Sequence, residues 1–156
     1  MKTKSKVVKS TDLFEFYELW KKLYIKYRDI THDDSKHISF PEPLSRMLAK
    51  KIDSTLVDAI KPYDFQGNIE MKSVTLPLSS NPKPNSHFSH KQNDCKRLLF
   101  FVITPESIDY YNITNKNLLS KINAKVAESP DTGANIALSD YIGKTNPIRI
   151  TIEKEE

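Results

Sequence analysis

Residues 55–76 read TLVDAIKPYDFQGNIEMKSVTL, and this stretch decides the predicted fold. The run 55–60 is mostly apolar and predicts an extended strand. Residues 61–67 contain a proline and a glycine and predict a turn. In 68–76 apolar and polar side chains alternate, which indicates a second strand with one buried face. We therefore expect a β-hairpin.

An acid and a base share one face of the second predicted strand. Glu70 and Lys72 are two residues apart and therefore point the same way. If the turn is symmetric about Asp64, Asp58 lies directly opposite Glu70 and within reach across the strand pair. The hairpin would then bring two carboxylates and one ammonium group together.

This set of side chains suits metal-assisted hydrolysis of a phosphodiester. Mg²⁺ takes oxygen ligands and keeps several waters, so two carboxylates and a scissile phosphate form a natural site. The ion neutralises developing charge, and a neighbouring lysine can orient the attacking water or stabilise charge. Asp58 and Glu70 are thus the predicted Mg²⁺ ligands, and Lys72 assists. An E-x-K triplet alone is more often a solvated ion pair, so the hypothesis depends on the whole hairpin.

The hairpin resembles that of a known family. The segment 57–60, the turn glycine Gly67 and the segment 69–73 resemble the catalytic hairpin of type II restriction endonucleases of the PD-(D/E)xK superfamily, particularly the small homodimeric ones. The resemblance implies an α/β fold with a restriction-endonuclease-like mixed central sheet flanked by helices. The catalytic hairpin is expected in the middle of that sheet. The resemblance also implies a homodimer that cuts double-stranded DNA at a short specific site with Mg²⁺.

The resemblance extends over residues 40–113. Related small enzymes have a helix with a glutamate before the hairpin, and the segment FPEPLS at 40–45 resembles it, which adds Glu42 to the catalytic candidates. Such enzymes also have a polar loop that enters a DNA groove, followed by a buried strand, here 97–103. The side chains expected to contact DNA are Asn85, Ser86, His87, Ser89, His90, Lys91 and Gln92.

Two alternatives concern single residues of this prediction. The family's Pro-Asp pair is not literally present, and Asp64 is a rival aspartate closer in sequence to Glu70. Asp58 is preferred because Asp64 is expected at the tip of the turn, where aspartate is common for local backbone reasons. His87 and His90 with Cys95 could instead bind a metal, but no fourth ligand follows at a typical spacing. The loop could also be a plain surface loop.

The remaining elements follow from apolar periodicity. A helix begins after a cap at Ser10 or Thr11, and its aromatic stripe is expected to pack on the chain's own core or also on a second subunit. Its apolar residues are Leu13, Phe16, Tyr17, Trp20, Leu23, Tyr24 and Tyr27. Further predictions are a helix over 42–52, paired strands at 97–103 and 107–113, a helix over 116–127 and a last strand at 147–152 on a sheet edge.

Length, charge and composition limit the domain organisation and the cellular location that can be expected. The chain has 156 residues and a net charge of +4, and the first ten residues hold four lysines and no acid, so the rest is neutral. Residues 1–10 are expected to be a flexible basic tail and 11–156 a single nuclease domain. No apolar run approaches the roughly 20 residues that span a bilayer, and no signal peptide is recognisable. With one cysteine, no intramolecular disulfide can form. These features predict a cytoplasmic protein.

Several function classes are disfavoured. The three glycines, at 67, 133 and 143, form no phosphate-cradling loop, and no G-x-S-x-G motif occurs, so a nucleotide cofactor and acyl transfer are not expected. The leading hypothesis is a site-specific endonuclease. The alternatives are a DNA repair or junction nuclease of the same superfamily and a DNA-binding module without catalysis.

Overall fold

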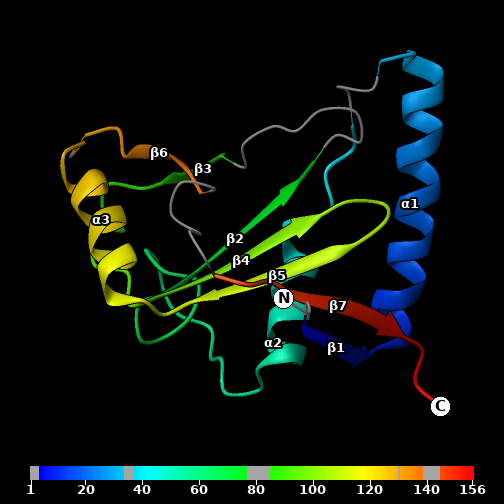
Figure 1. The fold of residues 1–156 in the computed structure, drawn as a ribbon, viewed down its shortest axis with the longest axis horizontal. Helices are drawn as coiled ribbons and strands as arrows, with labels where there is room; N and C mark the ends of the chain where they lie inside the picture. Colours follow the sequence, from blue (N-terminus) through cyan, green and yellow to red (C-terminus); the bar gives the residue numbers. More distant parts are fainter. Residues whose placement is uncertain (1–3, 34–36, 77–84, 130, 139–144) are drawn as a thin grey trace.

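The computed structural model describes residues 4–33, 37–76, 85–129, 131–138 and 145–156. Three helices and seven strands are assigned within these residues (Figure 1). In chain order they are β1 (Lys4–Lys9), α1 (Thr11–Thr31), α2 (Glu42–Ile52), β2 (Ile69–Thr75), β3 (Asn85–Phe88), β4 (Arg97–Ile103), β5 (Ile108–Ile113), α3 (Lys116–Ala127), β6 (Ala134–Ala137) and β7 (Ile148–Glu153).

A mixed five-stranded sheet forms the centre, with strand order β1-β7-β5-β4-β2. The outer pairs β1–β7 and β2–β4 are parallel, and the inner pairs are antiparallel. Helices α1 and α2 contribute to one buried cluster, whereas α3 and the small antiparallel sheet β3–β6 contribute to a second. The chain is therefore α/β with a mixed sheet and helices, as expected at this coarse level.

Helix α1 forms where the periodicity predicts it. The side chain of Ser10 caps the helix by accepting a hydrogen bond from the backbone N–H of Leu13. Leu13, Trp20 and Tyr24 are buried, and Trp20 Nε1 donates to the carbonyl of Ile38 at 3.0 Å. The predicted helices α2 and α3 are confirmed as well. Among the described residues, no helix is both long and apolar enough to cross a membrane.

Strand β4 is the most deeply buried strand. Leu98, Leu99, Phe100 and Phe101 are each fully buried, with alternate side chains in the two clusters. Large apolar side chains on both faces explain why the run is a central strand. Its antiparallel pairing with β5 confirms the predicted hairpin at 97–113.

The predicted hairpin at 55–76 is wrong in its first half. Residues 55–60 form no strand, and Asp58 makes only an isolated bridge with Phe65. The physical reason is burial: the run contributes Leu56 to the core, but Val57 and Ile60 are 53% and 94% exposed, so its apolar residues form no continuous buried face. Strand β2 pairs instead with β4 in a parallel register that sets Glu70 beside Leu98. β2 is consequently an edge strand and not a middle one.

Two predictions about the chain ends are also corrected. Residues 4–9 are not a flexible tail, because they form β1 and pair with β7. Val8 lies in the core, and Lys9 forms an ion pair of 2.6 Å with Glu153. The last strand, β7, lies between β1 and β5 and is not at the sheet edge.

Candidate active site

A cleft of about 840 Å³ lies beside the edge strand β2. Its walls come from β2, from the first turns of α2, and from the segments 59–64 and 86–92. Its polar lining includes Glu42, Arg46, Lys61, Asp64, Glu70, Lys72, Ser73, Ser86, Ser89, His90, Lys91 and Gln92. Most of the residues expected to be functional from the sequence therefore share one cavity.

Asp64 is held against the open edge of β2. An edge strand leaves half of its backbone groups without a neighbouring strand, and the N–H of Met71 donates to Asp64 Oδ2 at 3.0 Å. This bond sets the Asp64 carboxylate near Glu70, where it raises the pKa of the Glu70 carboxyl. The expectation that Asp64 lies at a remote turn tip is therefore wrong.

Glu70 is the least exposed ionisable side chain of the cleft, with 2% of its surface accessible. Its Oε2 lies 3.1 Å from Lys72 Nζ and accepts a hydrogen bond from Gln92 Nε2. Its Oε1 is buried and has no hydrogen-bond partner among the described residues. Burial, and next the Asp64 carboxyl, raise the pKa of Glu70 to about 8, while Lys72 acts in the opposite direction. Without a cation, Glu70 is thus largely protonated at neutral pH.

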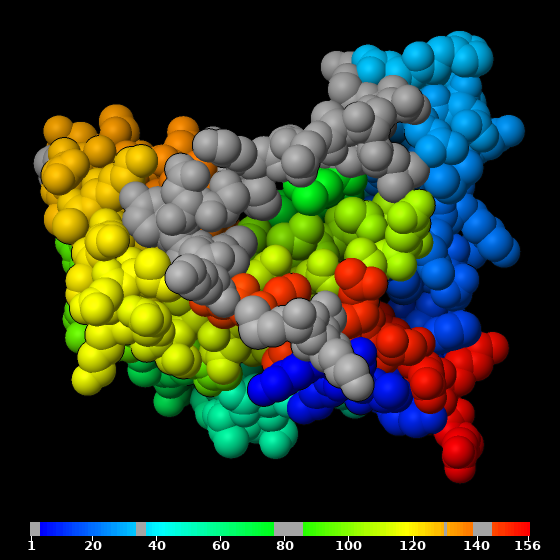
Figure 2. All heavy atoms as spheres, in the orientation of Figure 1, coloured from blue at the N-terminus to red at the C-terminus, as the bar shows by residue number. Residues whose placement is uncertain are grey.

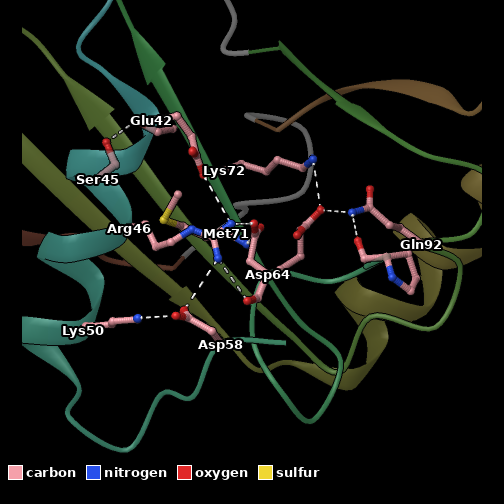
Figure 3. Close-up of polar contacts among 12 residues, drawn as sticks. Glu42, Ser45, Arg46, Lys50, Asp58, Asp64, Met71, Lys72 and Gln92 are labelled. Atoms are coloured by element: carbon pink, nitrogen blue, oxygen red, sulfur yellow. Dashed lines mark hydrogen bonds and ion pairs between the residues drawn. The ribbon is translucent and has the colours of Figure 1, made fainter. Parts of the chain in front are cut away.

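Lys72 is fixed on the same wall. Its Nζ donates to the carbonyl of His87 at 2.7 Å and lies 4.6 Å above the centre of the Phe88 ring. The side chain is 16% exposed and points into the space between β2 and β3 (Figure 3). Three partners hold this ammonium group, so its charge has a defined position next to Glu70.

Arg46 connects the acidic groups, and the sequence patterns gave no prediction for it. From α2 it forms an ion pair with Asp64, and its guanidinium nitrogens lie 3.7 Å from carboxylate oxygens of Glu42 and of Asp58 (Figure 3). It also covers the ring of Phe65 at 5.5 Å. The i,i+4 spacing from Glu42 was the one available signal, and it indicates only a helix-surface pair.

Asp58 is not brought to Glu70. It accepts a hydrogen bond of 2.7 Å from Lys50 Nζ, and this bond is the main reason that its pKa is lowered, with Arg46 adding to the effect. Its side chain is 58% exposed and does not line the cleft. The predicted cross-strand pairing of Asp58 with Glu70 is wrong, because residues 55–60 and β2 are not hairpin partners.

The residues predicted to contact DNA differ in where the structure places them. Four of them line the cleft with accessible side chains, namely Ser86, Ser89, His90 and Lys91. His87 is exposed and its Nδ1 lies 3.1 Å from Asn135 Oδ1. Asn85 lies in β3, and its side chain is outside the described part.

Gln92, the last residue predicted to contact DNA, is buried. Its Oε1 accepts from the N–H of Ser89 at 2.9 Å, and its Nε2 donates to the carbonyl of Pro62 at 2.5 Å as well as to Glu70. With 8% of its surface exposed, Gln92 orients Glu70 and is not placed to reach a base.

The donor set limits how a metal could bind. In the part of the chain that the structure describes, no group of three or more His, Cys, Asp or Glu side chains could hold an ion. The histidine and Cys95 alternative finds no support there, since Cys95 is buried and burial raises the pKa of its thiol to about 11. A cation in the cleft would have Asp64 and Glu70 as its protein ligands.

Comparison with protein-family models, with curated protein sequences and with solved structures found no match to this chain.

Proposed function

We propose that this chain is a Mg²⁺-dependent endonuclease that hydrolyses phosphodiester bonds of double-stranded DNA at a short specific site. The observation that carries the proposal is the buried carboxyl of Glu70, which has an oxygen with no hydrogen-bond partner in the described part of the chain, a second carboxylate near it and a fixed lysine on the same wall. A buried charge without full compensation destabilises the fold, and ionisable groups perturbed in this way cluster at functional sites.

Asp64 and Glu70 fit a hard divalent cation. Both offer carboxylate oxygens, and the proton that Glu70 holds at neutral pH is what a cation would displace. Two protein carboxylates leave the other ligand positions to water and to a phosphate, as is usual for Mg²⁺. When bound, the ion supplies charge neutralisation and a more acidic water.

The protein's own groups complete the chemistry. Lys72 stabilises negative charge that develops on the attacked phosphate, because its ammonium group is already positioned and needs no reorganisation. Gln92 keeps Glu70 in its orientation, and Arg46 does the same for Asp64. Glu42, at the start of α2, completes the acidic side of the cleft beside Arg46.

The rim of the cleft supports a nucleic acid as substrate. Lys61, His90 and Lys91 line it and can contact phosphates, while Ser86 and Ser89 offer short hydroxyl groups toward the same space. One cleft can cleave one strand of the DNA. Cutting both strands at a palindromic site therefore calls for two subunits related by a two-fold axis.

A cleavage assay tests the proposal. Purified protein is incubated with plasmid DNA in Mg²⁺ and, separately, in EDTA. Discrete bands that need Mg²⁺ are expected. A Mg²⁺-dependent smear or nick would point to the repair or junction alternative, and tight DNA binding without cleavage in any divalent metal would overturn the enzymatic proposal.

A matched pair of variants ties the activity to the cleft. Lys72→Met is expected to lose cleavage while keeping the fold. Lys96→Met is the control, because Lys96 is exposed, pairs with Asp94 at 2.8 Å and is not among the residues that line the cleft. Equal activity of the two variants would place the chemistry elsewhere.

A further inference from the structure

Helix α1 has an apolar face that its own core does not cover. Leu13, Trp20 and Tyr24 account for the buried face, and a second row of apolar side chains lies on the outside. This outer stripe consists of Phe16 (37% exposed), Leu19 (59%), Leu23 (57%), Tyr27 (39%) and Ile30 (66%). The helix stands at one margin of the molecule (Figures 1 and 2). Contiguous apolar surface of this kind marks an interaction site.

The stripe is symmetric about its middle residue. Its members are spaced by three, four, four and three residues, with Leu23 at the centre. If a second copy of the helix is turned end for end about Leu23, Phe16 meets Ile30 of the other copy, Leu19 meets Tyr27, and Leu23 meets itself. An isologous two-fold interface has this property of self-complementarity.

The charges of α1 select the antiparallel orientation. The acidic residues of its first half are Asp12, Glu15 and Glu18, and the basic residues of its second half are Lys21, Lys22, Lys26 and Arg28, with Asp29 the single acid among them. An antiparallel copy sets the acidic half against the basic half. A parallel copy would set like charges together, which is unfavourable.

We propose that the outer stripe of α1 is the interface of a homodimer in which the two α1 helices pack antiparallel about Leu23. Side chains of this size bury roughly 200 Å² each when enclosed, so the half-exposed stripe offers about 500 Å² per subunit and about 1,000 Å² in the dimer. That total is at the lower end of specific interfaces, so a weak dimer that depends on protein concentration is expected. The outer stripe shares no residue with the cleft, so this interface does not rest on the proposed nuclease function.

Sedimentation equilibrium of the full chain, without metal or DNA, tests the interface. The native protein is expected to approach twice its 18.0 kDa mass as its concentration rises. Leu23→Glu sets two carboxylates against each other on the two-fold axis and is expected to weaken the dimer about 100-fold or more. Ile60→Glu is the control, because Ile60 is equally apolar, 94% exposed and outside α1. It is expected to behave as the native protein.

Cysteine cross-linking tests the orientation. Leu23→Cys is expected to form a disulfide with itself under mild oxidation. Leu19→Cys alone is not, because the two positions would be about 12 Å apart along the helix axes, beyond the roughly 7 Å that a disulfide spans. An equal mixture of Leu19→Cys and Tyr27→Cys is expected to cross-link. Native protein is the blank, since Cys95 is buried.

Three results would overturn the proposal. They are a monomer at every concentration, a dimer that Leu23→Glu leaves intact, and a Leu19→Cys variant that cross-links to itself. None of these results depends on whether the protein cuts DNA, so the two proposals can fail separately.

Discussion

Replacing Glu70 by glutamine is expected to make the metal-free protein more stable at neutral and alkaline pH. The side chain keeps its shape, an amide oxygen can still accept from Lys72 and Gln92, and the uncharged amide N–H₂ can donate toward the nearby Asp64. What the change removes is the charge that Glu70 must acquire as pH rises.

The magnitude follows from linkage. The pKa of Glu70 is raised from 4.5 to about 8 in the folded chain. A raised pKa contributes stability that is fully present below pH 4.5 and is lost as pH rises toward 8, because the unfolded chain releases this proton first. At pH 8 the accumulated loss is about 4 kcal/mol. Because Glu70 is only 2% exposed, solvent does little to reduce it.

Urea unfolding in EDTA at a series of pH values between 4 and 8 measures this difference. The free energy of unfolding of Glu70→Gln should equal that of the native protein near pH 4 and exceed it increasingly toward pH 8. Glu106→Gln, at an exposed turn between β4 and β5, is the control and should show no such trend. Adding a divalent cation at pH 8 should stabilise the native protein and not Glu70→Gln. A difference that stays constant with pH would refute the reasoning.

Two further predictions concern the support of the cleft. Gln92→Leu removes the donor to Glu70 and leaves the carbonyl of Pro62 and the N–H of Ser89 without their partner, so we expect a loss of about 1–3 kcal/mol in the free energy of unfolding, measured with urea at pH 6. Gly133→Ala would bring a Cβ into overlap with the carbonyl oxygen of Phe88, at a backbone φ of +72°, and is expected to lower the free energy of unfolding by at least about 2 kcal/mol. An unchanged urea midpoint for either variant would contradict its prediction.

The helices and the central hairpin could be predicted because their signals are local. In α3 the buried residues Leu119, Ile122 and Val126 recur at spacings of three and four, which is the period of the helix that contains them. In β4 a short run of large apolar residues is bounded by polar ones. Each pattern depends only on which side of its own element is buried.

Strand pairing could not be predicted in the same way. β1 pairs with β7, from the opposite end of the chain, and its edge position leaves most of its side chains exposed, so its lysines suggested a tail. β2 was assigned a partner by sequence proximity, yet its partner is β4, more than twenty residues later. The hydrophobic pattern of a strand identifies its buried face and not its neighbour.

The candidate site could be predicted only in part, because a strand pattern shows which side chains share a face but not which segment lies beside the strand. Glu70 and Lys72 were found because alternation within one strand puts them on one face. The choice between Asp58 and Asp64 depended on the pairing of that strand. Once β2 is an edge strand, the free N–H of Met71 attracts the nearer aspartate, and Asp64 is the one beside Glu70.

Cleavage rates of Asp64→Asn and Asp58→Asn, measured side by side on one DNA substrate in the same Mg²⁺ buffer, test the central claim most directly. Loss of a metal ligand removes several kcal/mol of charge stabilisation. Asp64→Asn is therefore expected to slow cleavage about 1,000-fold. Asp58→Asn, which loses only the exposed contacts with Lys50 and Arg46, is expected to stay within about tenfold of the native rate. The reverse order would contradict the assignment of Asp64 and Glu70 as the metal-binding pair.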